Sequence, residues 1–570
     1  MQTAFKYKKA IGFMALCVFS LVACKKSYLD PQPFGRYSSD QLLSKKGIDG
    51  LLIGTYGMLD GQGIPGASGW MVGATNWVYG DVASDDAYKG TDAGDQPQMT
   101  EIEIYASQAA NTYFRFKWLS LYEGISRAND VINFSGKIPG ITDDEKKNYV
   151  AQARFLRGHF HFEAKRMWNK VPYIDEATTK YDNKTDIWPK IEADLKFAYD
   201  NLPETQALVG SANKWAAAAY LAKVYMYEKK FNEAKTLYDV IIAQGQTSNG
   251  KKYDLQDQYW KNFDIGYENS AEAVFSQQTQ ASGTVTGSAE TSYELAYPYG
   301  GVWGCCGFYQ PSQNLVNAYK TTADGLPFLD DSYNNDNLKN DEGITSNSPF
   351  TNDATTPLDP RLDWSVGRRG VPYWDYGQHP GRSWIRDQAY AGPYSPKKHV
   401  SKNTDLGNFT NVNNFRQTAK NYNIIRFADV LLMAAEAEIE VGSLEKARQY
   451  INRIRARAAN PGSMVTGAPA NYLIKDYAVP FADQATARKA VRFERRLELA
   501  MEGHRFFDLV RWGIAADVLN AYLAKEKDRR GYLKASGGFI KNKNEYYPIP
   551  NPVIEIAKKM GNDLQQNPGY

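Results

Sequence analysis

Cysteine is scarce in this chain, with 4 residues among 570. A disulfide scaffold is therefore excluded, because such folds need several paired cysteines within a short chain. Two of the four, Cys305 and Cys306, are adjacent. Adjacent cysteines can pair only in a small vicinal ring, so we expect free thiols here in preference to a disulfide.

A large charge excess is also missing, since the formal net charge is only +3. This balance argues against a nucleic-acid partner. His159 and His161 lie two residues apart in a predicted helix, on different sides, and cannot chelate one metal together. We expect no cofactor. The acidic stretch at 330–337 could hold a structural calcium ion, but it lacks the glycine and terminal glutamate of an EF-hand loop, so a solvated turn is the preferred interpretation.

Long hydrophobic runs are absent beyond the N-terminus. There, three lysines precede an apolar run at 10–20, which is too short to span a bilayer permanently. The sequence L-V-A-C that follows resembles a bacterial lipobox, which implies cleavage before Cys24 and acylation of that residue. An ordinary secretory signal is the alternative. We expect a signal peptide at 1–23, a lipidated tether at 24–36 and a soluble body anchored to a membrane.

Amphipathic helix patterns are abundant. The segments 215–244 and 426–458 each predict a pair of helices joined by a short turn. Ala222 in the first pair recurs as Ala435 in the second, 213 residues later, and three further positions keep that offset. Small residues at a fixed offset indicate a repeated tetratricopeptide-like unit. Such units bury their apolar faces by stacking, so we predict a mainly α solenoid.

Aromatic residues are also plentiful, with 39 tyrosines and 12 tryptophans. Many of these rings fall outside the helical patterns, in a Gly- and Asp-rich loop at 61–94 and in an irregular stretch at 245–422. A structureless loop as long as the second is implausible, so we expect it to fold as a subdomain on the solenoid. Tyrosine and tryptophan offer a flat apolar face with a polar edge, which suits carbohydrate rings.

The segment 491–513 combines an apolar helical stripe with a dense group of charges. Arg495 and Arg496 stand among three glutamates spaced four residues apart, and two phenylalanines and a tryptophan follow. Arginine is suited to buried, bidentate pairing with carboxylates. We therefore predict a polar strut that locks helices together, not a catalytic site.

This segment resembles the C-terminal signature of the SusD/RagB family, the nutrient-binding surface lipoproteins of Bacteroidetes. The resemblance continues in Y-Y-P-I-P at 546–550 and L-Q-Q-N-P-G-Y at 564–570. It implies about four tetratricopeptide-like helix pairs, divided between an N-terminal region at 37–244 and a C-terminal region at 423–570. The stretch 245–422 would be the inserted, loop-rich subdomain.

The resemblance also implies a function: non-catalytic capture of a glycan on the exterior of the outer membrane and its delivery to a SusC-like TonB-dependent transporter. Carried over by position, the implied ligand-binding residues are Asn76, Trp77, Tyr299, Trp303, Tyr309 and Trp374. A peptide receptor of the RagB type is the alternative. A surface glycosidase would need two carboxylates about 5 to 9.5 Å apart. The chain contains no nucleophile elbow, HExxH motif or phosphate loop, so we expect no enzyme.

Overall fold

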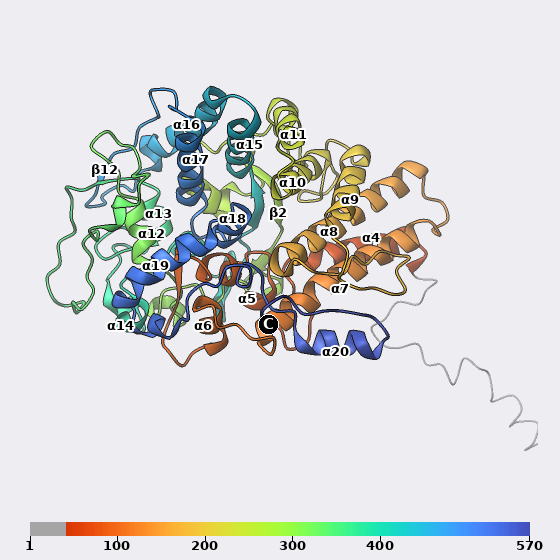
Figure 1. The fold of residues 1–570 in the computed structure, drawn as a ribbon, viewed down its shortest axis with the longest axis horizontal. Helices are drawn as coiled ribbons and strands as arrows, with labels where there is room; N and C mark the ends of the chain where they lie inside the picture. Colours follow the sequence, from red (N-terminus) through yellow and green to blue (C-terminus); the bar gives the residue numbers. More distant parts are fainter. Residues whose placement is uncertain (1–41) are drawn as a thin grey trace, which may run out of the picture.

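A computed structural model describes residues 42–570, and helices dominate it (Figure 1). The signal peptide, the tether and Cys24 lie outside the described residues. The α-helices are α4 (Lys45–Gly57), α5 (Gly69–Val72), α6 (Pro97–Glu103), α7 (Thr112–Ser135), α8 (Asp143–Trp168), α9 (Trp188–Asn201), α10 (Lys214–Tyr227), α11 (Phe231–Gln244), α12 (Gln313–Ala318), α13 (Leu362–Ser365), α14 (Gln388–Ala391), α15 (Phe427–Val441), α16 (Leu444–Ala459), α17 (Gln484–Leu499), α18 (Arg505–Arg511), α19 (Ala515–Arg529) and α20 (Asn551–Lys559).

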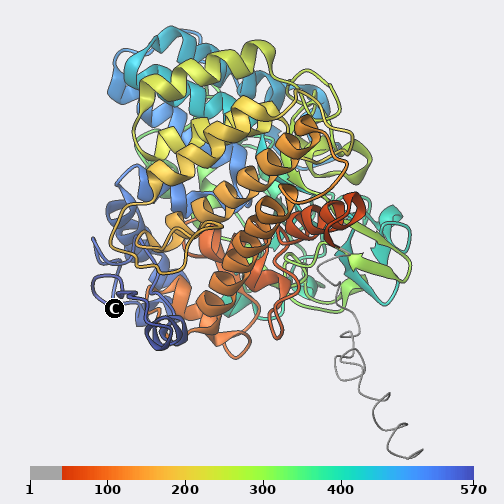
Figure 2. The same cartoon turned by 90° about the vertical axis from the view of Figure 1, so that its right-hand side faces the viewer.

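The long helices stack in sequence order. Helix α7 packs on α8, α8 on α9, α9 on α10 and α10 on α11, while α15 packs on both α16 and α17. Helix α11 packs directly on α15, although 182 residues separate the end of one from the start of the other. Both Ala222 and Ala435 are fully buried within these helices. The predicted solenoid, interrupted by a long insertion, is therefore confirmed (Figures 1 and 2).

Local sequence signals explain where these helices begin. At the start of α8, the Thr142 hydroxyl accepts a hydrogen bond from the Glu145 amide at 3.2 Å, and the Glu145 carboxylate accepts one from the Thr142 amide at 2.9 Å. This reciprocal capping box satisfies two amides that the helix itself leaves unpaired. The side chains of Asn213 and Ser443 cap α10 and α16, each by accepting a hydrogen bond from a backbone amide of the first turn.

The segment between α11 and α15 is irregular, and both its strands and its helices are short. Strand β2 (Ala273–Gln277) pairs with β11 (Tyr422–Arg426) where this segment leaves and rejoins the helices. Strand β1 (Ala87–Gly90) pairs with β5 (Phe308–Pro311), which ties the loop after α5 to the insertion. The remaining strands form small two-stranded pairs: β3 (Gln280–Ser282), β4 (Val285–Ser288), β6 (Pro357–Leu358), β7 (Val366–Gly367), β8 (Ser395–Pro396), β9 (Thr410–Asn411), β10 (Asn414–Thr418) and β12 (Asn471–Tyr472).

The predicted polar strut is present, but its pairing differs from the simple sequence pattern. Arg495 reaches Asp429 on α15 at 2.7 Å, and Arg496 reaches Asp86 in the N-terminal loop at 2.7 Å. Neither arginine pairs with the glutamates of its own helix. Helix α17, which carries both arginines, therefore joins α15 on one side to the loop after α5 on the other.

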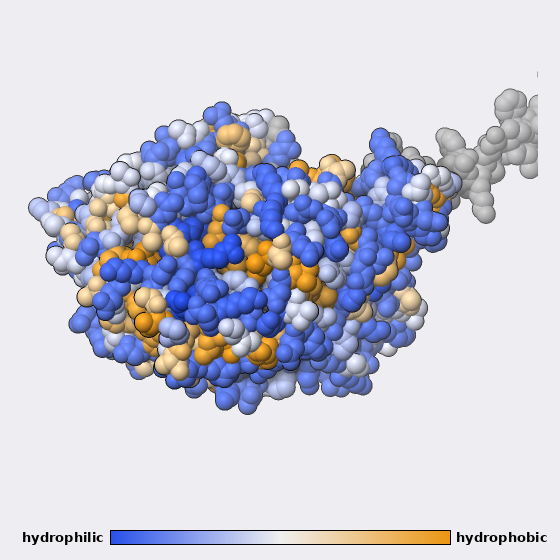
Figure 3. Space-filling view, turned by 90° about the horizontal axis from the view of Figure 1, so that it is seen from above, coloured by the Kyte–Doolittle hydropathy of each residue, from blue (hydrophilic) through white to orange (hydrophobic). Residues whose placement is uncertain are grey.

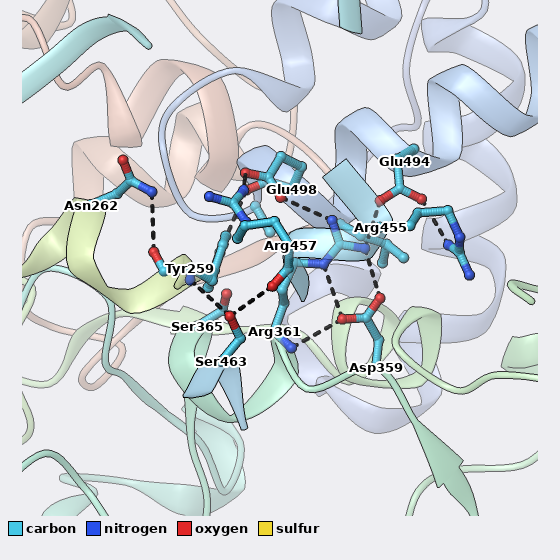
Figure 4. A network of polar contacts seen from close by, with 12 residues as sticks. Tyr259, Asn262, Asp359, Arg361, Ser365, Arg455, Arg457, Ser463, Glu494 and Glu498 are labelled. Atoms are coloured by element: carbon cyan, nitrogen blue, oxygen red, sulfur yellow. Dashed lines mark hydrogen bonds and ion pairs between the residues drawn. The ribbon is translucent and has the colours of Figure 1, made fainter. Parts of the chain in front are cut away.

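Those glutamates instead hold arginines from other segments in a buried network (Figure 4). The Glu498 carboxylate contacts Arg361 at 2.9 Å and Arg426 at 2.5 Å, and it also contacts Arg457. All four of these side chains are almost completely buried. Burial by itself would raise the pKa of Glu498, but the three guanidinium groups outweigh it and hold the pKa well below its usual value.

Two observations concern the predicted attachment to a membrane. Within residues 42–570, no helix is long and apolar enough to cross a membrane. Seen from above, the surface is mostly hydrophilic, and its hydrophobic residues form separate patches (Figure 3).

Candidate functional site

Three of the six predicted ligand-binding residues lie in the core. Trp77 and Tyr309 are 0% exposed and Asn76 is 3% exposed. The Trp77 ring lies 5.0 Å from the Tyr309 ring, and its Nε1 donates to the Ser292 carbonyl at 2.7 Å. Asn76 donates from Nδ2 to the Glu163 carboxylate at 2.9 Å. The Trp77 Nε1 and the Asn76 Nδ2 thus have protein partners, and none of the three side chains is open to solvent. A role of these residues in ligand binding stays a prediction.

The other three predicted residues lie together near the surface of the insertion. Tyr299 is 36% exposed, whereas Trp303 is buried and Trp374 is half-buried. The Trp303 ring packs 6.1 Å from Tyr373 and 4.7 Å from Tyr376. Trp374 donates from Nε1 to the Lys397 carbonyl at 2.9 Å. Tyr299 is therefore the most exposed of the predicted rings.

Tyr299 forms the centre of a surface that we call the Tyr299 shelf, made of Tyr299, Val302, Trp384, Arg386 and the loop at 91–95. Trp384 ends the short helix η6 (Arg382–Trp384), is half-buried, and packs its ring 5.1 Å from that of Trp303. The Tyr299 amide donates to the Trp384 carbonyl at 2.9 Å, and Val302 is 49% exposed. Among residues 42–570, the Tyr299 hydroxyl and the Trp384 Nε1 have no hydrogen-bond partner. The shelf thus combines open rings with free polar groups.

Arg386 joins the two chain regions that build the shelf. Its guanidinium lies 5.6 Å from the Tyr299 ring centre and contacts Asp92 at 2.8 Å and Asp95 at 2.7 Å. Lys89 fixes the same loop by donating to the carbonyls of Asp92 and Asp95 at 2.8 and 2.7 Å. Burial lowers the pKa of Lys89, against the opposing influence of nearby acids. The loop after α5 and the insertion are thereby held as one surface.

Gly307 lies beneath this surface at the start of β5. Its φ is +79°, and an added Cβ would lie 3.2 Å from the Tyr299 Cβ and 3.7 Å from the Arg386 Cβ. A side chain at this φ is strained, and an added Cβ would be tightly packed against the Tyr299 Cβ. The backbone at Gly307 therefore packs directly against Tyr299 and helps to position its ring.

Replacing Gly307 with alanine should displace Tyr299 and weaken ligand binding at the shelf by about tenfold, on the scale of losing one stacking contact. Gly304→Ala is the matched control, because Gly304 has a φ of +69° but no atom within 4 Å of an added Cβ. Both variants should lose about 1 kcal/mol of stability from the backbone strain. Equal binding by the two variants would show that Gly307 does not position the ring.

Cys305 and Cys306 form a disulfide, so the expectation of free thiols is wrong. The pair lies in the loop that joins Trp303 to β5, and Arg416 donates to the Cys306 sulfur at 2.9 Å. The disulfide therefore belongs to the segment that carries Tyr299 and Val302.

The sequence left Trp384 and Arg386 out of the predicted site. Trp384 carries the same signal as the other aromatics of the insertion, a ring among Gly, Ser and Arg residues. Arg386 gives no such signal, because its two aspartate partners lie 294 and 291 residues earlier in the chain. Only the folded arrangement shows that this arginine belongs to the site.

Within residues 42–570, no group of three or more His, Cys, Asp or Glu side chains is arranged to hold a metal ion. At the acidic stretch 330–337, the Asp330 carboxylate accepts hydrogen bonds from the Ser332 amide and hydroxyl at 3.2 and 2.6 Å. The preferred solvated turn and the alternative calcium ion both remain predictions.

The solenoid, the insertion and the shelf define a class of helical-repeat proteins with a loop-rich subdomain between repeat units. A family model described as "SusD family" matches residues 271–570, and a second, described as "Starch-binding associating with outer membrane", matches residues 28–226. The chain belongs to the SusD/RagB family. The resemblance seen in the sequence is confirmed.

Curated relatives and solved structures agree with this assignment. "SusD-like protein P2" of Formosa agariphila is 26% identical over 99% of this chain and 100% of its own. A "SusD-like protein" of Bacteroides ovatus is 26% identical over 79% of each chain. The fold matches a SusD superfamily protein of Bacteroides vulgatus with a TM-score of 0.66 and 21% identity, covering 92% of this chain and 99% of that one. It also matches "Surface glycan-binding protein A" of Bacteroides thetaiotaomicron, solved with laminarihexaose, with a TM-score of 0.64 and 19% identity over 92% and 99% of the chains.

Proposed function

We propose that this protein is a non-catalytic binding protein that captures an oligo- or polysaccharide at the Tyr299 shelf. The observation that carries the proposal is the exposed Tyr299 ring, which lies 5.6 Å from the fixed Arg386 guanidinium and next to the half-buried Trp384. Aromatic faces stack on the apolar faces of sugar rings, and fixed polar groups select the hydroxyl positions. Two proteins of similar fold, a laminarin-binding SusD-like protein and a surface glycan-binding protein in complex with laminarihexaose, support a glycan as the ligand.

The proposal includes the cellular setting. Acylation of Cys24 would anchor the protein to the outer membrane, facing the exterior, and the captured glycan would pass to a SusC-like TonB-dependent transporter. The description of the N-terminal family model, which mentions association with the outer membrane, supports this location. Globomycin inhibition of lipoprotein processing, followed by protease treatment of intact cells, tests the anchor and the orientation separately.

The shelf itself is tested by Tyr299→Ala in the purified protein. We expect glycan affinity to fall by about tenfold or more, because one stacked ring is worth about 0.5–1.5 kcal/mol beyond the area that it buries. Isothermal titration against a panel of neutral and acidic glycans measures the change. The melting temperature should stay close to that of the wild type, since the ring lies at the surface.

Tyr267→Ala is the matched control, because Tyr267 is 40% exposed and does not belong to the shelf. It should bind glycan as the wild type does. Equal affinity of the two variants would remove the shelf from the proposal. Binding to peptides instead of glycans in the same panel would assign the protein to the RagB-type alternative, and release of reducing sugars by the purified protein would contradict a non-catalytic role.

A further inference from the structure

A cavity of about 230 Å³ lies away from the shelf, where five parts of the chain meet. The ends of α8 and α10, the start of α9, helix α18 and the Y-Y-P-I-P segment enclose it. Figure 1 shows α18 near the centre of the molecule. It is lined by Lys165, Arg166, Asn169, Trp188, Tyr227, Lys229, Phe507, Val510, Arg511, Gly513 and Tyr546. None of these residues belongs to the Tyr299 shelf.

Four of the residues that line this cavity are aromatic. Trp188 and Tyr227 lie 5.9 Å apart between ring centres, and the Arg166 guanidinium lies 4.0 Å from the ring centre of Phe507. Tyr546 closes the cavity from the C-terminal segment. Flat rings around a space of this size suit a ligand with a single ring.

The polar groups of the lining are mostly hydrogen-bond donors. Four of the lining residues are basic and none is acidic. Three of these cations are fixed by carboxylates that do not line the cavity: Lys165 by Asp186 at 2.9 Å, Arg166 by Glu163 at 2.6 Å and Arg511 by Glu436 at 2.6 Å. These carboxylates neutralise the three cations and also fix their positions at the cavity.

Three donors remain free. Across residues 42–570, the ammonium of Lys229, the Nε1 of Trp188 and the amide nitrogen of Asn169 have no hydrogen-bond partner. Lys229 is exposed and is the one basic lining residue without an ion pair among the described residues. A carboxylate, which only accepts hydrogen bonds when ionised, is the group that such a set of donors can satisfy.

We propose that this cavity is a second ligand site, which binds a single ring bearing a carboxylate. The ring would lie among Trp188, Tyr227 and Tyr546, and the carboxylate would face Lys229 and the free N–H groups. Two sources share this chemistry: a uronic acid unit of a glycan, and an aromatic residue at the C-terminus of a peptide. The site does not depend on the shelf, so the two can be tested apart.

Isothermal titration of the purified protein with four small probes tests the site. Glucuronate and phenylacetate carry both a ring and a carboxylate, glucose is the neutral ring, and acetate is the carboxylate without a ring. We expect saturable binding of glucuronate, phenylacetate or both at millimolar concentrations, and much weaker binding of glucose and acetate. The probe that binds more tightly assigns the source. Binding of glucose as tight as that of the tighter carboxylated ring, or no saturable binding of either carboxylated ring, overturns the proposal.

Two variants tie the binding to this cavity. Lys229→Gln removes the charge but keeps a polar side chain that can donate, and should weaken binding of the carboxylated ring by about fivefold because the lysine is partly solvated. Tyr546→Ala should weaken it more strongly, while Tyr546→Phe should keep the affinity, since the ring is retained. Tyr299→Ala should leave this binding unchanged and lower only glycan binding at the shelf. Unchanged affinity in both Lys229→Gln and Tyr546→Ala would place the bound probe elsewhere.

Discussion

Replacing Glu498 with alanine is expected to lower the free energy of unfolding by about 3–5 kcal/mol, the usual result of removing one partner from a buried ion-pair network. The carboxylate of Glu498 contacts Arg361, Arg426 and Arg457, and all four side chains are buried. Without it, these guanidinium groups lose the negative charge that they share. A buried charge that loses its partner keeps its desolvation penalty, and this drives the loss of stability.

The local backbone should survive this change. The Glu498 carbonyl accepts hydrogen bonds from Arg426 at 2.7 Å and from the Tyr259 hydroxyl at 3.0 Å, and alanine keeps that carbonyl. The variant therefore isolates the contribution of the carboxylate. Urea unfolding followed by circular dichroism measures the loss, as a shift of the midpoint.

Asp200→Ala is the matched control for this prediction. Asp200 pairs with Lys196 at 2.6 Å on the surface of α9, where both side chains are about half exposed. Exposed pairs contribute little, so the expected loss is below about 1 kcal/mol. Comparable losses in Glu498→Ala and Asp200→Ala would mean that the network is not the source of stability that its burial indicates.

The helical part of the fold was readable from the sequence because its signals are local. The capping box at Thr142 lies within four residues, and the repeat offset between Ala222 and Ala435 depends only on spacing along the chain. The sequence predicted that the polar strut would consist of buried ion pairs, because arginines and carboxylates are clustered in it. The sequence did not predict which residues pair, since Arg496 contacts Asp86, 410 residues away in the chain.

The binding surface was less readable because sequence alone does not separate exposed rings from buried ones. Trp77 and Tyr299 both stand in aromatic, Gly-containing loops, yet one is buried and the other exposed. What separates them is a partner far away in the chain: the Trp77 Nε1 donates to Ser292, 215 residues later. The prediction of free thiols at Cys305 and Cys306 failed for a related reason. The spacing of two cysteines does not reveal the loop conformation that brings their sulfurs together.

Trp77→Ala is expected to destabilise the protein by about 3–5 kcal/mol, the usual range for removing a fully buried large aromatic side chain. The ring packs against Tyr309, and its N–H satisfies the Ser292 carbonyl. Alanine would leave a cavity between the N-terminal loop and β5 and an unpaired carbonyl within it. Thermal and urea unfolding measure this loss.

Trp77→Phe separates a role in the core from a role in binding. Phenylalanine keeps most of the apolar contact with Tyr309 but cannot donate to Ser292, so the stability loss should be smaller, about 1–3 kcal/mol. Glycan affinity, measured at a temperature where the variant is fully folded, should stay within about twofold of the wild type, because the ring does not reach the shelf. A loss of more than tenfold in affinity with unchanged stability would instead place Trp77 in contact with the ligand, as the sequence alone predicted.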